Sequence, residues 1–261
     1  MPGFLALYLL FLVEAKMIAR KLHYCWFGGR PMPLQARCSL ASWAYHLPDY
    51  EVVRWDEQSF DPASHPFTSA AYAAGCYAFV SDYVRMFALA QEGGIYLDVD
   101  VEALMSLDDC LDADFFIGLE DRKRFGTSLL GSIAGHWLPL SMLDYYDHTQ
   151  FAINRASDLV NVNEVSRLLI EAGFNGEGGN ERRGREHIYA IGSFGVSAKA
   201  AGLACATKHY ARHLFAGTWR SRPGKSVPSR VWRWLRKVPK RIRALAMLTF
   251  YRLGRRLRGF Y

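Results

Sequence analysis

Hydrophobic positions near the start of the chain predict a strand, a helix and a second strand, in that order. Residues 18–27 have the composition of a core strand and are followed by glycines and a proline-rich turn. Residues 34–45 repeat their apolar positions at helical spacing, and residues 50–55 alternate as a second strand. This order is typical of an α/β domain.

The strongest helical pattern covers residues 70–91 and stops at Gly93-Gly94, as helices often do at glycine. Residues 95–97 then form a short apolar run, which predicts a buried strand. This strand ends in Asp98-Val99-Asp100. Because open α/β sheets bind ligands at the carboxyl ends of their strands, we expect both carboxylates at a binding site.

Beyond Asp100 the pattern is weaker. It predicts an acidic turn at 108–114, a strand at 115–119 and a glycine-rich loop at 175–180. The 261 residues suffice for one full α/β domain, and 51% hydrophobic residues are typical of a globular protein. We predict one core domain, residues 17–219, and a tail, residues 220–261.

The first residues contain an apolar run, 3–13, that is shorter than the about 20 residues of a membrane-spanning helix. It also lacks the basic region and cleavage site of a signal peptide. We interpret residues 1–16 as a leader upstream of a true start at Met17, with a short membrane-touching helix as the alternative. The five cysteines show no C-x-x-C pair and predict reduced core thiols in a cytoplasmic protein.

Basic residues are concentrated in the tail. After Glu186 the chain has 17 Lys or Arg and no acidic residue, which leaves 15 basic against 25 acidic residues before it. This argues against a nucleic-acid-binding core and for a local contact with an anionic surface. Residues 240–258 combine arginines with apolar residues at helical spacing. We predict peripheral binding to the inner face of the cell membrane; a helix packed on the core is the alternative.

The D-x-D segment has its own chemistry. Asp98 and Asp100 cannot both point the same way along an ideal strand, so the chain must bend there. Carboxylate oxygens favour Mg²⁺ or Mn²⁺, which would bridge a diphosphate. A solvated Asp pair in a turn is the plain alternative. The run YLDVDV also fits an aspartyl phosphatase with Asp98 as nucleophile, but no acidic pair follows Glu186 to hold the metal of that family.

The longer context FVSDYVRMFALAQEGGIYLDVD resembles the D-x-D glycosyltransferases of family 32, which include capsular-polysaccharide enzymes and the catalytic domain of the large glucosylating cytotoxins. The opening HYCWFGG and the late H-x-x-x-x-G-T-W, residues 213–219, are similar to the first and last blocks of that family. The resemblance implies a GT-A-type α/β domain with a mixed sheet. It also implies transfer of a sugar from a nucleotide-sugar.

The same resemblance implies a role for each matched residue. Trp26 would stack on the base, an aromatic contact worth about 1–3 kcal/mol, and its alternative is a core tryptophan. Asp82 and Arg85 share a helix face and would hold the donor sugar and its phosphate; alone they would suggest a surface ion pair. Asp98 would meet the ribose and the sugar, and Asp100 the metal. Supporting contacts to the donor are implied for Ser81, Tyr96, Thr218 and Trp219.

His213 is the third of the metal ligands that the resemblance implies, after Asp100 and Asp98. Leu214 and Thr218 depart from the family's usual His and Ser, so a core histidine is the alternative. The family retains the anomeric configuration, and the sequence shows no second carboxylate placed as a nucleophile. This predicts a front-face displacement. We expect a Mn²⁺- or Mg²⁺-dependent enzyme that uses a UDP-sugar, with GDP-mannose as the alternative, and a polysaccharide or lipid-linked acceptor.

Overall fold

A seven-stranded mixed sheet of order β2-β1-β3-β6-β5-β8-β7 forms the centre of the molecule. The structure, a computed structural model, describes residues 17–195, 200–215, 248–249 and 251. The strands of this sheet are β1 (Lys21–Cys25), β2 (Glu51–Trp55), β3 (Gly94–Leu97), β5 (Phe115–Asp121), β6 (Arg124–Ser132), β7 (Glu181–Arg183) and β8 (Glu186–Tyr189). A second sheet pairs β4 (Val101–Ala103) with β9 (Ala211–His213). The predicted fold class, an α/β domain with a mixed sheet, is confirmed.

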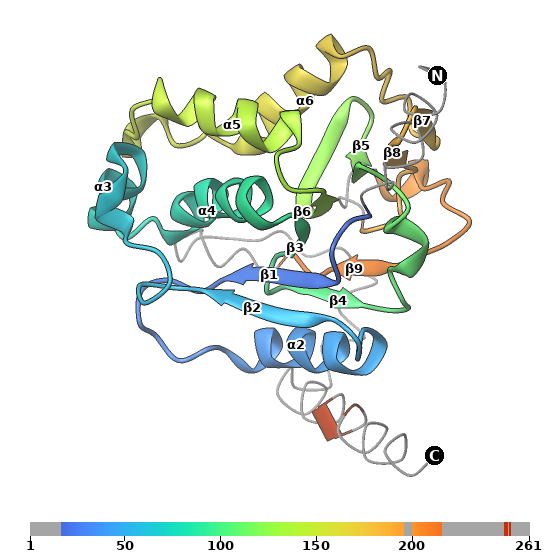
Figure 1. Ribbon diagram of the computed structural model, residues 1–261, viewed down its shortest axis with the longest axis horizontal. Helices are drawn as coiled ribbons and strands as arrows, with labels where there is room; N and C mark the ends of the chain where they lie inside the picture. The colour runs from blue at the N-terminus through green and yellow to red at the C-terminus, as the bar shows by residue number, and fades with distance from the viewer. Residues whose placement is uncertain (1–16, 196–199, 216–247, 250, 252–261) are drawn as a thin grey trace, which may run out of the picture.

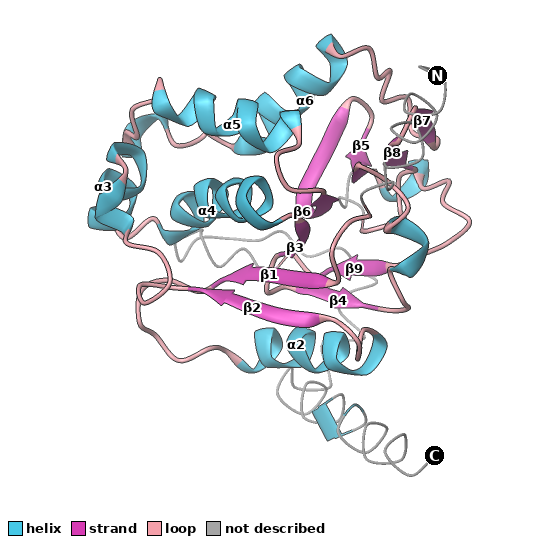
Figure 2. Cartoon of the chain, viewed as in Figure 1, coloured by secondary structure: helices cyan, strands magenta, loops and turns pink. Residues whose placement is uncertain are grey.

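Helices cover both faces of the large sheet. They are α2 (Leu34–His46), α3 (Pro66–Ala73), α4 (Tyr77–Glu92), α5 (Trp137–Asp147) and α6 (Asn161–Glu171), with short 3₁₀ turns at Pro62–Ser64, Asp108–Cys110, Ile153–Arg155 and Ala201–Leu203. Figure 1 shows α3 to α6 on one side of the strands and α2 on the other. Figure 2 shows the same layers by type of element.

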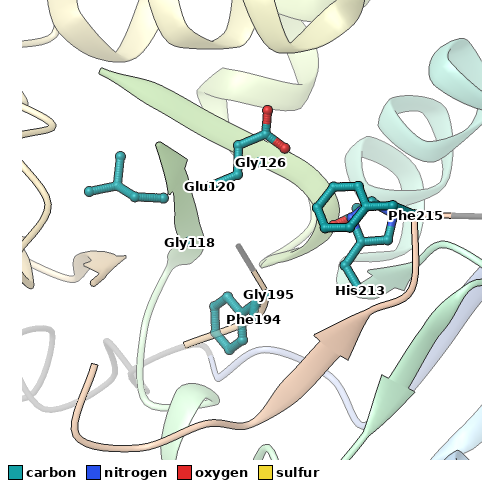
Figure 3. Close-up of a pocket in the computed structure, with 9 residues that line it drawn as sticks. Gly118, Glu120, Gly126, Phe194, Gly195, His213 and Phe215 are labelled. Atoms are coloured by element: carbon teal, nitrogen blue, oxygen red, sulfur yellow. The ribbon is translucent and has the colours of Figure 1, made fainter. Parts of the chain in front are cut away.

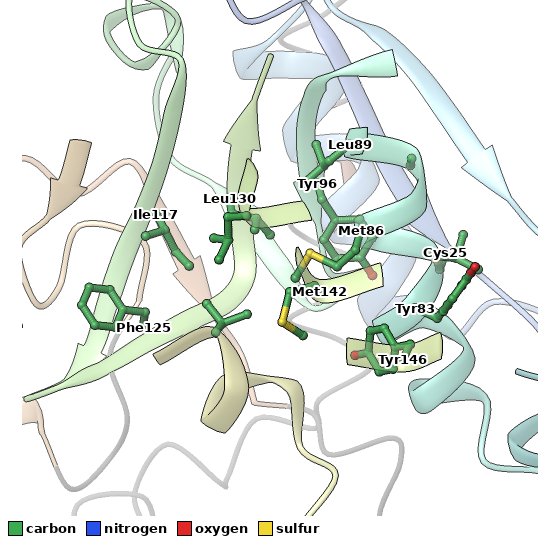
Figure 4. Close-up of a cluster of buried hydrophobic side chains, with 14 of the residues drawn as sticks. Cys25, Tyr83, Met86, Leu89, Tyr96, Ile117, Phe125, Leu130, Met142 and Tyr146 are labelled. Carbon is green, nitrogen blue, oxygen red and sulfur yellow. The ribbon is translucent and has the colours of Figure 1, made fainter. Parts of the chain in front are cut away.

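Each face of the sheet has its own hydrophobic core, because successive strand residues point to opposite faces. Tyr96 joins the core under α3 to α6, together with Met86, Leu130 and Tyr146 (Figure 4). Its neighbours on β3 belong to the second core, beneath α2 and the small sheet. There Trp43 of α2 donates a hydrogen bond of 2.9 Å to the Val101 carbonyl. The small sheet is thereby fixed against α2.

The order of the strands determines which side chains meet at the carboxyl end of β3. Strand β1 runs parallel to both β2 and β3, whereas β6 runs antiparallel to β3. Helix α4 leads directly into β3 through Gly93, whose φ of 64° favours glycine. A Cβ on Gly93 would also lie 2.6 Å from the Ala134 nitrogen. The helix and the strand are therefore held in one fixed relation.

The elements before residue 100 match their predictions closely. The predicted strands and helices correspond to β1, α2, β2, α3 with α4, and β3, and the predicted strand at 115–119 lies within β5. Cys25, Cys38 and Cys110 are buried, but Cys205 is exposed and Cys76 partly so, so the prediction of core thiols is wrong for these two.

The leader, residues 1–16, lies outside the described residues, as does most of the tail. Three tail residues are described. Leu248 and Tyr251 are buried, and the Tyr251 hydroxyl donates to Glu102 of β4 at 2.8 Å. Within the described part of the chain, no helix has the length and apolar character needed to cross a membrane.

Candidate active site

The D-x-D segment forms a tight turn between the two sheets. The Asp98 amide donates to the Ser128 carbonyl of β6 at 2.8 Å, and the Val101 amide closes the turn on the Asp98 carbonyl at 2.9 Å. The expected bend after β3 is therefore present. Val101 then starts β4, which pairs with His213 of β9. The turn thus sends the chain from the large sheet into the small one.

This pairing brings His213 to the two aspartates. One ligand atom each from Asp98, Asp100 and His213 lies within 4.8 Å of the others. His213 Nε2 is 3.2 Å from Asp100 Oδ1, and only 16% of the histidine side chain is exposed. The Leu214 amide also donates to the Asp100 carbonyl at 2.9 Å. Its ion pair distinguishes His213 from a histidine packed only among apolar side chains.

Arg85 of α4 lies behind this cluster. Its Nη2 is 2.8 Å from Asp82 Oδ1 and 3.1 Å from Asp98 Oδ1, so one guanidinium nitrogen bridges both carboxylates. The Tyr96 hydroxyl donates to the same Asp98 oxygen at 3.0 Å. With 5% of the Arg85 side chain exposed, the Asp82–Arg85 pair is a buried bridge and not the surface ion pair that the spacing alone suggested.

Two residues that the sequence analysis missed complete the network. Thr127 of β6 accepts hydrogen bonds from Arg85 Nη1 through its carbonyl, at 2.7 Å, and its hydroxyl, at 2.9 Å. Asn161 of α6 accepts from the Thr127 hydroxyl at 2.9 Å and donates to Asp82 at 3.0 Å. Neither residue belongs to a motif: the pairing of β6 with β3 brings Thr127 here, and the packing of α6 on β6 brings Asn161.

Burial and charge act against each other in this network. Burial raises the pKa of Asp82 to about 6, although Arg85 works in the opposite direction. Burial also raises the pKa of Asp98. For Arg85, burial by itself disfavours the charge, but the carboxylate of Asp98 and the other nearby groups outweigh it, so its pKa is raised. The arginine stays charged and offsets part of the negative charge of the two aspartates.

His213 follows the same balance. Burial disfavours its protonated form, yet the hydrogen bond and the negative charge of Asp100 outweigh burial and raise its pKa. The negative charge of the aspartates therefore favours a cation at this position.

The donor set fits a divalent cation. Two carboxylates and one imidazole are suitable ligands for Mn²⁺, and carboxylate oxygens suit Mg²⁺ as well. Three protein ligands also leave coordination positions for phosphate oxygens and water. Asp98, Asp100 and His213 are thus the residues that would hold the ion, and they form the one such group among the residues that the structure describes.

Trp26 lies in the loop after β1, at the same sheet edge as the D-x-D turn. The Trp26 side chain is partly exposed, and its indole nitrogen donates to the Arg30 carbonyl at 2.7 Å. The loop is anchored where Gly28 donates to Glu57 at 2.6 Å. Ser81 donates to the Tyr77 carbonyl within α4 at 3.0 Å. Thr218 and Trp219 lie outside the described residues.

The clustered carboxylates and the buried arginine lie at the carboxyl end of a core strand, which is where open α/β sheets bind their ligands. The comparison with known families is more specific. Residues 33–117 match the model of the glycosyltransferase sugar-binding region containing the DXD motif. The predicted family resemblance is confirmed for this segment. The match includes Asp82, Arg85 and both aspartates of the turn but not His213.

A curated relative supports the same assignment. Inositol phosphoceramide mannosyltransferase 3 of Schizosaccharomyces pombe is 32% identical over 93 residues, which are 34% of this chain. The match spans about a quarter, 26%, of the relative's length. The relative is thus similar to this chain over one segment and not over the whole protein.

Two glycosyltransferases are among the solved structures with a similar arrangement. The PaToxG glycosyltransferase has a TM-score of 0.49 and 15% identity, over 61% of this chain and 71% of its own. The galactosyltransferase LgtC has a TM-score of 0.41 and 14% identity, over 88% of this chain and 95% of its own. Because both TM-scores are below 0.5, the fold class follows from the strand order alone.

Proposed function

We propose that this chain is a metal-dependent, retaining glycosyltransferase that moves a sugar from a nucleotide-sugar to a glycan or lipid-linked acceptor. The observation that carries the proposal is the cluster of Asp98, Asp100 and His213 beside the buried Arg85, within or next to the matched region. A bound divalent ion would neutralise charge on the departing nucleoside diphosphate. Retention and the front-face course are proposed from the family resemblance.

The chain's own residues have distinct tasks in this scheme. Arg85 is fixed by Thr127 and two carboxylates, so its charge is held in place before the donor arrives. Such preorganised charge stabilises a developing anion without rearrangement. Asp82, held by Asn161 at 3.0 Å, presents a carboxylate that accepts hydrogen bonds from sugar hydroxyls. Trp26 would stack on the base beyond the D-x-D turn.

Two donor classes remain in the proposal. The family resemblance favours a UDP-sugar, whereas the name of the S. pombe relative favours a mannosyl donor such as GDP-mannose and a sphingolipid-type acceptor. A polysaccharide or lipid-linked acceptor of the cell surface is consistent with both.

A screen of UDP- and GDP-sugars with Mn²⁺ tests the proposed reaction. We expect one donor to release its nucleoside diphosphate, with release abolished by EDTA and restored by Mn²⁺. p-Nitrophenyl phosphate is the counter-substrate, because an aspartyl phosphatase using Asp98 would cleave it without any nucleotide. Cleavage of this ester with no release from any nucleotide-sugar would contradict the proposal.

We also propose that the tail binds anionic lipid at the inner face of the cell membrane and keeps the site near lipid-linked acceptors. The support is the run of basic residues after Glu186. In flotation, the full chain is expected to bind anionic vesicles more strongly than neutral ones and to lose binding at high salt. Replacing Arg255, Arg256 and Arg258 by Gln should weaken flotation. Equal flotation with neutral and anionic vesicles would exclude this role.

A further inference from the structure

A small pocket lies beside His213, on the side of β5 and β6. Among the groups that line it are the glycines Gly118 and Gly126 and the side chains of Glu120, Ser128, His213 and Phe215. Figure 3 shows Phe215 over the His213 ring on one side of the pocket and Glu120 on another. Glu120 and Phe215 have no part in the functional roles assigned above.

Two irregularities in the pairing of β5 with β6 create the pocket. Ile117 pairs with Leu130, but the next residue, Gly118, pairs with Gly126. Residues 127–129 therefore have no partner on β5, although Leu129 still pairs with Leu97 of β3 on the other side of β6. The sheet opens at this point, and Ser128 lines the opening.

The second irregularity places Glu120. Leu119 pairs with Phe125 and Asp121 with Arg124, so Glu120 is the extra residue of a bulge in β5. Bulges of this kind often redirect a side chain next to an active site. A Cβ built on Gly126 would lie 3.6 Å from Glu120 Oε2, so this oxygen is close to the glycine floor of the pocket. The other oxygen, Oε1, accepts from Arg124 at 2.5 Å.

The sheet order places the pocket relative to the donor. Trp26 follows β1, Asp98 follows β3, and Ser128 of β6 is bonded to the Asp98 amide. Gly118 on β5 is one strand further along the same edge. A donor that extends from Trp26 to the metal cluster would leave the β5 side of that cluster free. The pocket is on that side.

The pocket offers the two kinds of group that recognise a sugar ring. Only 19% of the Glu120 side chain is exposed, and a fixed carboxylate accepts strong hydrogen bonds from neighbouring hydroxyls. Phe215 stacks on His213 with ring centroids 3.9 Å apart and is 46% exposed, so a flat apolar surface remains for the carbon face of a sugar.

We propose that the mouth of this pocket is the acceptor subsite, where Glu120 binds hydroxyls of a neutral sugar ring that lies across the opening and Phe215 packs against the face of that ring. The inference rests on the proposed function, because an acceptor needs an active donor site. Glu120 positions the acceptor and determines which acceptor is bound. His213 both lines the pocket and belongs to the metal cluster, so the two sites adjoin.

The first test replaces Glu120 by Gln and measures transfer to p-nitrophenyl galactoside, glucoside and mannoside, using the donor that the screen identifies. We expect the KM of the best of these acceptors to rise about tenfold or more, as for loss of a charged hydrogen bond. The donor KM should change by no more than about twofold. The matched control is Glu171→Gln, which removes an exposed carboxylate paired with Arg167 at 2.5 Å on the outer face of helix α6.

A second variant tests the space itself. In Gly126→Ala the new Cβ would meet Glu120 at 3.4 to 3.7 Å, which is ordinary contact, and no unusual φ is required. The methyl group would narrow the pocket without straining the protein. We again expect a higher acceptor KM at similar thermal stability. Gly179→Ala is the control, because nothing lies within 4 Å of its new Cβ.

The outcomes separate the two proposals. A donor KM that rises as much as the acceptor KM in both variants would assign the pocket to the donor and overturn the inference. Unchanged acceptor KM values in both variants would overturn it as well. Absence of nucleotide release by the unaltered chain with every donor would instead refute the proposed function, before any variant is compared.

Discussion

Asp100→Asn is expected to lower kcat by about a thousandfold or more, equivalent to about 4 kcal/mol of transition-state stabilisation. The substitution keeps the volume of the side chain but removes a charge from the cluster of Asp98, Asp100 and His213. Asp98→Asn should have a similar effect, because Asp98 also forms an ion pair with Arg85. The measurement is steady-state release of the nucleoside diphosphate at saturating Mn²⁺.

Metal binding supplies a second readout that does not depend on turnover. Ligands that bind the folded state raise its stability, so Mn²⁺ with the nucleoside diphosphate should raise the Tm of the unaltered chain. The increase should be much smaller for Asp100→Asn. Asp112→Asn is the control. It also removes a carboxylate, but the Asp112 side chain is 80% exposed and pairs with Arg185, which is not part of the metal cluster. Activity of Asp100→Asn within tenfold of the unaltered chain would remove Asp100 from the metal site.

The site residues that could be predicted from the sequence lie close together along the chain. Asp82, Arg85 and the two aspartates all lie between residues 82 and 100, where α4 passes through Gly93 directly into β3. Helical spacing places Asp82 and Arg85 on one face, and the strand end places the aspartates. Local geometry therefore determines their proximity, and the long motif made it visible in the sequence.

The remaining part depends on pairings between distant segments. Thr127 and Glu120 reach the site because β6 runs antiparallel to β3 and because its register with β5 shifts twice. No periodic pattern signals such shifts. Strands β4 and β9 have three residues each, too few for alternation to be recognised. His213 could be proposed from the family resemblance, but its contact with Asp100 follows only from the pairing of these two short strands.

The contacts that the tail makes with the core could not be predicted from the sequence either. The apolar spacing of residues 240–258 suggested an amphipathic helix, but the pattern alone cannot determine what the apolar side chains contact. Tyr251 bonds to Glu102, which also pairs with Arg212 of β9. Glu102 is 2% exposed, so this buried carboxylate has two partners from distant parts of the chain. Such a contact follows from the fold of the core and has no signature in the tail itself.

Replacing Arg85 by Met should destabilise the protein by about 3–5 kcal/mol, because it would leave two buried carboxylates without their cation. Asp82 and Asp98 both direct Oδ1 at Arg85 Nη2, and their side chains are only 14% and 27% exposed. The free energy of unfolding is measured by urea denaturation. Arg167→Met is the matched control: Arg167 also pairs with two carboxylates, Glu164 and Glu171, but it is 51% exposed, so its loss should cost about 1 kcal/mol or less.

The deficit of Arg85→Met should depend on pH in a defined direction. Burial already raises the pKa of Asp82 to about 6, and removal of Arg85 raises it further, since this cation lowers it. A carboxyl with a raised pKa in the folded state binds more protons there than in the unfolded chain, so stability falls as pH rises through that range. The deficit should therefore be larger at pH 8 than at pH 5. Arg85→Lys restores the charge, but its one nitrogen has three N–H donors, whereas two nitrogens of Arg85 contact four acceptors, two on Thr127 and one on each aspartate. It should recover part of the stability and little of the turnover, and full recovery of both by lysine would show that the planar guanidinium is not required.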